Sequence, residues 1–270
     1  MISASTPDQY VVMGNPISHS KSPYLHTKFA EQCQQAMQYN SLLVDLNGFA
    51  SAVQQLVGRG VKGANVTLPF KLDAFQLCTT LSARAQAAGA VNCLTFSGPY
   101  ILGDNTDGDG LVIDITRNAG VSLTGKRLLI CGAGGAARGA LLPILECQPS
   151  EIVIANRTVA KAEQLAEQFS RYGNLQCAQF EHLSGQFDVV INATSASIAA
   201  QRPPVPESIY SADTLAYDLM YADQPTLFMQ HAAQQQACTR DGWGMLVEQA
   251  AQAFYSWRGI RPDTSGFLKK

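Results

Sequence analysis

Residues 127–139 read RLLICGAGGAARG, and this stretch decides how the chain folds. A short apolar run stops at glycines and passes into an Ala/Leu-rich segment, which predicts a strand, a tight turn and a helix. Gly132, Gly134 and Ala137 have the spacing G-x-G-x-x-G/A. In that pattern the first glycine makes the turn, the second lets backbone approach a pyrophosphate, and a small third residue lets helix and strand pack closely. Since a helix start also offers free N–H groups to phosphates, we predict a dinucleotide-binding domain.

The residues after the next predicted strand, 151–155, indicate which dinucleotide is bound. An acidic residue at this point would bind the ribose hydroxyls of NAD, but the chain has Asn156, Arg157 and Thr158. A guanidinium can fork two hydrogen bonds onto a phosphate, and Lys161 adds charge one helical turn later. The alternative is a solvated Arg/Lys pair at a helix start. We predict NADP rather than NAD.

Composition sets limits on the class of protein. The chain has 270 residues, 46% of them apolar, and a net charge of −2, which describes an ordinary globular protein of one or two domains. No basic patch predicts nucleic-acid binding, and no long apolar run predicts a membrane span. The N-terminus lacks the layout of a signal peptide, and the seven cysteines are scattered without a C-x-x-C pair. We therefore expect a cytoplasmic protein with reduced thiols and no metal site.

The first half alternates predicted strands and helices. Strands are expected at 10–13, 40–46 and 63–67, helices at 23–35, 49–57 and 83–88, and a hairpin at 91–102. Ser22 before Pro23 is a good helix N-cap. Ser20 and Ser22 together could hold a carboxylate at that helix end, although a cap and a polar loop explain both serines equally well.

Two charged residues in this half invite a functional interpretation. Pro69 suits the first turn of a helix, which places Lys71 where the helix dipole does not favour a cation. An exposed lysine there would cost little, so the position alone does not decide. Asp107 lies in the turn GDNTDG and could simply cap a helix over residues 110–119.

The second half continues as a doubly wound sheet. Residues 187–193 are a near-continuous apolar strand of the kind buried in parallel sheets, and 214–219 form a further strand. The hydroxyl-rich residues Thr194, Ser195 and Ser197 follow the first of these strands, at the edge where such sheets bind ligands. Helices are expected at 158–169 and 225–235, and a long amphipathic helix at 246–257 ends the chain. The fold class is α/β.

With these residues laid out, the chain resembles the shikimate dehydrogenases, the NADP-dependent enzymes of aromatic biosynthesis. The resemblance extends from MGNP at 13–16 to the last helix. Six motifs in order carry it: SHSKSP at 18–23, GANVTLPFK at 63–71, GAVN at 89–92, GDNTDG at 103–108, NRT at 156–158 and DGWGML at 241–246. Any one motif could arise by chance, whereas six in order are specific.

The family implies two α/β domains. Residues 1–106 and 243–270 would form the substrate-binding and catalytic domain, to which the last helix returns, and residues 107–242 a Rossmann-type NADP-binding domain. The active site would be the cleft between them. The implied reaction is the reversible NADPH-dependent reduction of 3-dehydroshikimate to shikimate, in a monomer or homodimer without nucleic-acid or membrane partners.

The family's roles carry over residue by residue. The catalytic pair would be Lys71 and Asp107. The substrate carboxylate would be bound by Ser20, Ser22 and Tyr221, and its ring oxygens by Asn65, Thr67, Asn92, Asp107 and Gln249. The cofactor would be bound by Gly132, Ala133, Gly134, Gly135, Ala136, Asn156, Arg157, Thr158, Lys161, Thr194, Leu219, Gly242 and Met245. These residue types suit the chemistry, because ketone reduction requires a proton on oxygen and a hydroxyl-rich acid requires many hydrogen-bonding groups.

The chain departs from the family pattern at three positions. Ser197 stands where the family usually has glycine, Cys93 where threonine is common, and Ala137 fills the third fingerprint position. The substitution at Ser197 predicts a stiffer or differently shaped loop near the nicotinamide. Two other functions remain open: a quinate or quinate/shikimate dehydrogenase of broader range, often using NAD, and a non-catalytic NADP-binding regulator on the same fold. Arg157 and Lys161 argue against NAD, and the presence of both Lys71 and Asp107 argues against a regulator.

Overall fold

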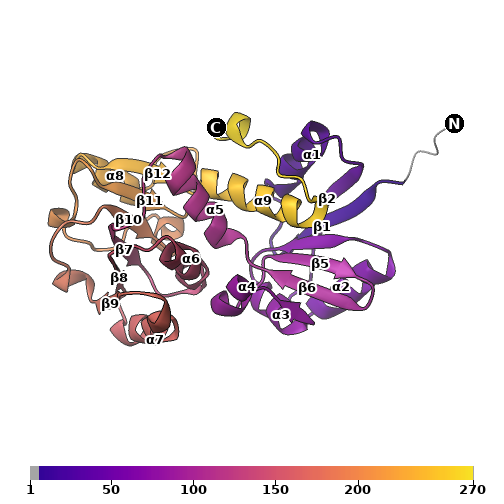
Figure 1. Cartoon of the computed structure of the whole chain (residues 1–270), viewed down its shortest axis with the longest axis horizontal. Coiled ribbons are helices and arrows are strands. Elements are labelled where there is room, and N and C mark those ends of the chain that lie inside the picture. Colours follow the sequence, from indigo (N-terminus) through magenta and orange to yellow (C-terminus); the bar gives the residue numbers. More distant parts are fainter. Residues whose placement is uncertain (1–5, 270) are drawn as a thin grey trace. The chain divides into compact units, whose positions relative to one another are not determined.

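The computed structural model describes residues 6–269 (Figure 1). The chain forms two units, one comprising residues up to Gly110 and from Val247 onward, the other Leu111–Leu246. Both boundaries fall inside helices, α5 (Asp107–Ile113) and α9 (Trp243–Arg258). The sequence had suggested division at 106/107 and 242/243, at the starts of these two helices.

The first unit is built on a mixed sheet with strand order β2-β1-β3-β5-β6-β4. Its strands are β1 (Asp8–Gly14), β2 (Met37–Leu43), β3 (Gly63–Val66), β4 (Thr80–Leu81), β5 (Cys93–Ser97) and β6 (Tyr100–Asp104). Strand β1 runs parallel to both β2 and β3, whereas β5 and β6 form the predicted antiparallel hairpin. The helices are α1 (Ser22–Gln32), α2 (Phe49–Gly58), α3 (Lys71–Leu77) and α4 (Ala83–Ala88).

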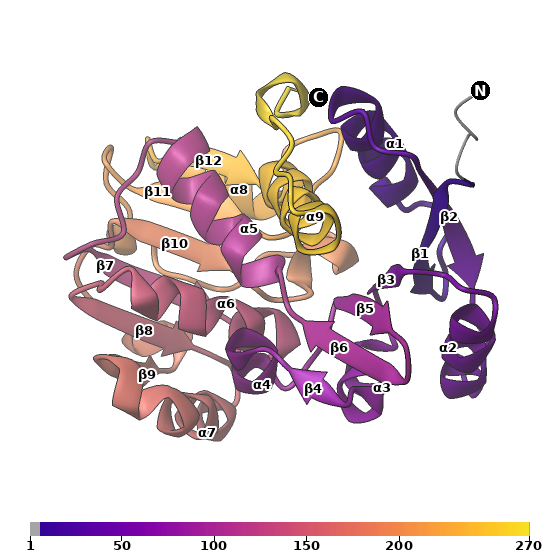
Figure 2. The same cartoon turned by 45° about the vertical axis from the view of Figure 1, so that its right-hand side comes forward.

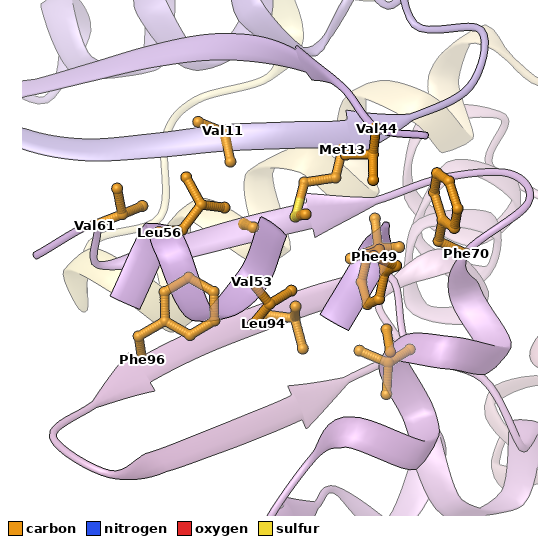
Figure 3. Packing of buried hydrophobic residues seen from close by; sticks show 14 of the residues in the cluster. Val11, Met13, Val44, Phe49, Val53, Leu56, Val61, Phe70, Leu94 and Phe96 are labelled. Atoms are coloured by element: carbon orange, nitrogen blue, oxygen red, sulfur yellow. The ribbon is translucent and has the colours of Figure 1, made fainter. Parts of the chain in front are cut away.

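Alternation along β1 gives this sheet two apolar faces. Val11 and Met13 point to one face, where they pack with Val53 and Leu56 of α2 (Figure 3). Tyr10 and Val12, the alternate residues of β1, point to the other face and pack with Tyr39 and Trp257. The central strands β1 and β3 are therefore buried on both faces, whereas β2 and β6 carry several exposed residues.

The second unit is an all-parallel sheet with strand order β12-β11-β10-β7-β8-β9 (Figure 2). Its strands are β7 (Arg127–Cys131), β8 (Glu151–Ala155), β9 (Leu175–Ala178), β10 (Val189–Asn192), β11 (Leu215–Asp218) and β12 (Cys238–Asp241). Its helices are α6 (Gly135–Glu146), α7 (Val159–Phe169) and α8 (Leu227–Gln234). Numbered within the unit, the strands follow the order 3-2-1-4-5-6 of the dinucleotide-binding fold. The order reverses between β7 and β10, the point at which this fold binds its ligand.

Several elements differ from the sequence-based expectation. Ser22 is the first residue of α1 rather than its cap, and β2 begins at Met37 instead of residue 40. Helix α5 begins at Asp107 and continues as a π-helix, Asp114–Asn118. Asp114, the first residue of the π-helix, is buried, and its carboxylate forms an ion pair with Arg240 of β12 at 2.6 Å. This ion pair holds the start of the π-helix against β12. Strands β4, β9 and β12 were not predicted, since they are short and carry no clear alternation.

Two further observations concern residues 6–269. Within this range no helix is both long and apolar enough to cross a membrane. In the same range no group of three or more His, Cys, Asp or Glu side chains is arranged to hold a metal ion.

Candidate active site and cofactor-binding site

The first unit joins Lys71 and Asp107, which lie far apart in sequence. Lys71 is the first residue of α3, and Asp107 is the first residue of α5. Pro69 lies in the turn before the N-cap residue Phe70, not in the first helical turn as the sequence had suggested. Lys71 Nζ lies 2.6 Å from Asp107 Oδ2, and the two side chains are 28% and 24% exposed. The ammonium and the carboxylate thus form an ion pair that solvent or a ligand can reach. Such a pair can deliver or accept a proton at a bound oxygen.

Asn92 holds the second oxygen of the same carboxylate. Its Nδ2 donates to Asp107 Oδ1 at 2.8 Å, and its Oδ1 accepts the backbone N–H of Thr106 at 2.8 Å. Gln249 Oε1 lies 3.4 Å from the same Nδ2. Because Asn92, Thr106 and Gln249 are all buried, their hydrogen-bond network holds the Asp107 carboxylate in one orientation. The structure therefore gives Asn92 a positioning contact in addition to the substrate contact that the resemblance implied.

Asn65, on β3, joins the same polar cluster by a hydrogen bond to the backbone of Asn92. Its Nδ2 donates to the backbone carbonyl of Asn92 at 3.1 Å, and its Oδ1 accepts the phenol O–H of Tyr39 at 2.6 Å. Burial raises the pKa of the Tyr39 phenol well above its usual value, so this group stays protonated and remains a donor. Both ends of the Asn65 amide are thereby fixed in one orientation.

His26 lies beneath Tyr39 and is fully buried. The two rings stack with centroids 4.2 Å apart and an interplanar angle of 5°. Burial lowers the pKa of His26 to about 3, a shift that the nearby Asn65 opposes only weakly. Neither ring nitrogen has a hydrogen-bond partner of normal geometry within residues 6–269. His26 is therefore a neutral packing residue that fixes the Tyr39 ring.

The two serines predicted to bind a carboxylate lie together at the start of α1. Ser20 Oγ accepts the backbone N–H of Ser22 at 3.3 Å, so Ser20, rather than Ser22, satisfies a free amide of this helix end. Ser22 is buried and lies near the Tyr39 phenol, whereas Ser20 is half-buried. Thr67 directly follows β3, and its backbone N–H donates to Met13 O at 2.9 Å.

In the second unit, the glycine fingerprint has the predicted geometry. Gly132 has φ +106°, and a Cβ at this position would lie 3.0 Å from the carbonyl oxygen of Ala193. Only glycine is free of strain there. A Cβ at Gly134 or Gly135 would meet nothing within 4 Å among the described residues. Since Gly134 caps α6 without a side-chain hydrogen bond, the N–H groups of the first turn are open to a phosphate.

The residues predicted to bind the ribose phosphate follow β8. Asn156 Nδ2 donates to Thr158 O at 2.8 Å, which holds the turn before α7. Arg157 and Lys161 are exposed, and Thr158 caps α7 without a side-chain hydrogen bond. Two cations with exposed side chains at an uncapped helix start are suited to an anionic group.

Three of the residues predicted to border the nicotinamide lie at the carboxyl ends of β10, β11 and β12. Thr194 Oγ1 donates to Asn192 Oδ1 at 2.7 Å, and the Leu219 N–H donates to Asn192 O at 3.1 Å. Gly242 N–H donates to Met220 O at 3.1 Å, and its Cα is so close to Leu219 O that no Cβ would fit. The structure thus brings together Thr194, Leu219 and Gly242.

Two other predicted residues lie near this group in the chain. Met245 is in the first turn of α9 and half-buried. Tyr221 follows β11, its ring 5.8 Å from that of Trp243, and burial raises the pKa of its phenol.

Comparison with known families agrees with this geometry. The family model "Shikimate dehydrogenase substrate binding domain" matches residues 12–94. The model "Shikimate / quinate 5-dehydrogenase" matches 114–208, and "Shikimate 5'-dehydrogenase C-terminal domain" matches 242–269. Together these three models account for most of the chain. The chain belongs to the shikimate dehydrogenase family.

Individual proteins and solved structures also match this chain over nearly their whole length. The protein named shikimate dehydrogenase (NADP(+)) from Herminiimonas arsenicoxydans is 57% identical over 96% of this chain and 94% of its own. The crystal structure of an Ael1 enzyme from Pseudomonas putida has a TM-score of 0.93 at 47% identity, covering 97% of each chain. The Thermus thermophilus shikimate 5-dehydrogenase, solved with NADP(H) and shikimate, has a TM-score of 0.86 at 29% identity over 97% of each chain.

Proposed function

We propose that the protein catalyses the reversible NADPH-dependent reduction of 3-dehydroshikimate to shikimate, a step of aromatic amino acid biosynthesis. The observation that carries the proposal is the ion pair of Lys71 with Asp107, 2.6 Å apart and open to a ligand, in a chain of this family. The names of the relatives support the substrate and the cofactor.

In the proposed mechanism, Lys71 and Asp107 carry the proton. The ammonium of Lys71 donates a proton to the carbonyl oxygen as that oxygen becomes a hydroxyl, and takes it back in the reverse direction. Asp107 holds the ammonium through Oδ2 and is itself held by Asn92 through Oδ1. The amine therefore stays in one place while its charge changes. When bound, NADPH supplies the hydride.

Substrate recognition by the first unit follows from its remaining polar groups. Three amides meet in the buried cluster: Asn65 from β3, Asn92 from the residue before β5, and Gln249 from α9. These amides already bond within the protein, and any further N–H or oxygen lone pair that a ligand covered without bonding would cost roughly 1 to 3 kcal/mol, which favours a small compound rich in hydroxyls. We propose that Ser20, Ser22 and Thr67 contribute to the same recognition, and that Tyr221 also contacts the substrate carboxylate.

The second unit fits NADP through its own residues. The tight turn at Gly132 and the open first turn of α6 are suited to a pyrophosphate. The exposed Arg157 and Lys161 are suited to the extra phosphate that NADP carries. Thr194, Leu219, Gly242 and Met245 would border the nicotinamide. The free state of all seven cysteines supports a reducing compartment, which we propose is the cytoplasm.

One assay separates this proposal from its two rivals. The purified protein is tested with shikimate and with quinate, each with NADP+ and with NAD+. We expect the highest kcat/KM for shikimate with NADP+. Equal activity on quinate would indicate the broader dehydrogenase. Binding of NADP+ without turnover of either substrate would indicate the regulator, and would overturn the proposal.

A further inference from the structure

The carboxylate of Asp218 is the centre of a buried hydrogen-bond network at the end of β11. The side chain is 0% exposed and accepts four hydrogen bonds, none of them from a charged group. The donors are Ser197 Oγ at 2.6 Å, Thr226 Oγ1 at 2.7 Å, Met220 N–H at 3.1 Å and Asn192 Nδ2 at 3.2 Å. A buried carboxylate held only by neutral donors depends on each of them, because the loss of one is not made up by a salt bridge.

Ser197 connects this network to the loop that follows β10. It lies in the short 3-10 helix Ala196–Ala199, and its hydroxyl also accepts Asn192 Nδ2 at 3.1 Å. The other end of the Asn192 amide accepts both the N–H and the hydroxyl of Thr194, at 3.1 and 2.7 Å. Ser197 therefore closes a ring of hydrogen bonds with Asn192 and Asp218, and Thr194 is joined to this ring through the Asn192 amide oxygen.

The same ring reaches the loop after β11. Asp218 Oδ1 accepts the N–H of Met220, and Asn192 O accepts the N–H of Leu219. Two loops from adjacent strands are thus joined through one serine hydroxyl and two buried side chains. Thr194 and Leu219, the residues that face the nicotinamide in the proposed function, are the two ends of this arrangement.

We propose that Ser197 is a positioning residue that fixes the nicotinamide-side loops through Asp218 and Asn192. The inference rests on the proposed function for the identity of the cofactor. A glycine at this position would have no hydroxyl and could make neither bond. In this chain the loop is held by side-chain hydrogen bonds, and the backbone freedom that glycine gives is absent.

The expected effect is confined to the nicotinamide half of the cofactor. Ser197→Ala leaves Asp218 without its shortest hydrogen bond and frees one side of Asn192. We expect NADP+ to bind about tenfold more weakly, the range that follows from losing a hydrogen bond to a carboxylate. Ser197→Thr keeps the hydroxyl and should bind NADP+ within about twofold of the unchanged protein.

Calorimetric titration with two probes tests the proposal. NADP+ contacts both halves of the site, whereas adenosine 2′,5′-bisphosphate has the ribose phosphate but no nicotinamide. We expect Ser197→Ala to weaken NADP+ alone and to leave the fragment unchanged. Ser208→Ala, at an exposed serine in the 3-10 helix Glu207–Ile209 of the same unit, is the matched control and should change neither.

The outcomes separate the inference from the proposed function. Equal weakening of both probes, or no weakening of NADP+, would overturn the role of Ser197 while leaving NADP binding intact. If the unchanged protein binds neither probe, the proposed cofactor itself is wrong. A melting temperature measured for each variant distinguishes local loosening from loss of fold.

Discussion

Tyr39→Phe removes one oxygen atom and tests whether the Asn65 amide must be held in place for substrate binding. The ring should stay where it is, because it stacks on His26 with centroids 4.2 Å apart. What is lost is the 2.6 Å hydrogen bond from the phenol to Asn65 Oδ1, together with the phenol's contact with Ser22. Asn65 is 5% exposed, so water does not readily replace the missing donor.

The size of the effect follows from that burial. An unsatisfied buried carbonyl costs roughly 1 to 3 kcal/mol. Without the phenol, only the hydrogen bond from Asn65 Nδ2 to the Asn92 carbonyl opposes a flip of the Asn65 amide. If about 1.4 kcal/mol of this appears in ligand binding, the KM for shikimate rises about tenfold. We expect the KM for NADP+ to change less than about twofold, because the change is confined to the substrate-binding unit.

Steady-state kinetics with each substrate varied in turn gives the required comparison. Tyr10→Phe is the matched control: Tyr10 is also buried, on β1, but its hydroxyl is 3.5 Å from Arg258 and contacts none of the proposed substrate residues. An unchanged KM for shikimate in Tyr39→Phe would refute the reasoning. So would an equal rise in Tyr10→Phe, which would indicate a general loss of packing.

Two further predictions concern the cofactor and the dependence of stability on pH. Arg157→Ala should weaken the binding of NADP+ at least tenfold and that of NAD+ less than twofold in calorimetric titration, since only NADP+ carries the ribose phosphate. Equal losses for the two cofactors would show that Arg157 does not bind that phosphate. Arg171→Ala, at another exposed arginine, is the control. His26 has a pKa of about 3 when folded and about 6.5 when unfolded, so the unfolded chain gains a proton first and stability falls as the pH is lowered from about 6.5 towards 3. His26→Phe should remove about 2 kcal/mol of the stability loss between pH 6.5 and 5 in urea unfolding, and identical pH dependence in both proteins would contradict a buried neutral His26.

The sequence was most informative where one short segment determines its own structure. The turn at Gly132 was predicted from its spacing, and the structure confirms strand β7, the turn and helix α6. Lys71 was placed in the first turn of a helix, and this too is confirmed. Pro69 was expected in the same helical turn, but it lies in the turn before the N-cap residue Phe70.

Contacts between distant elements could not be predicted from the pattern. Tyr39 and Asn65 lie on β2 and β3, which flank β1 on opposite sides, and nothing in local spacing links them. Asp218 ends an apolar strand and gave no signal of its own, although Ser197 was noticed as a departure from the family. Asn92 was expected to contact substrate, and its bond to Asp107 depends on how the hairpin β5–β6 meets α5. Such pairs become visible only when the register of the strands is known.

The role of Lys71 as the proton donor is tested most directly by the kcat of Lys71→Ala, measured for shikimate oxidation with and without added ethylamine. The account predicts that kcat falls by about 10²- to 10⁴-fold, with a small change in the KM for shikimate, and that the free amine restores part of it. A kcat close to that of the unchanged protein would contradict the account, because it would place the proton transfer on another group.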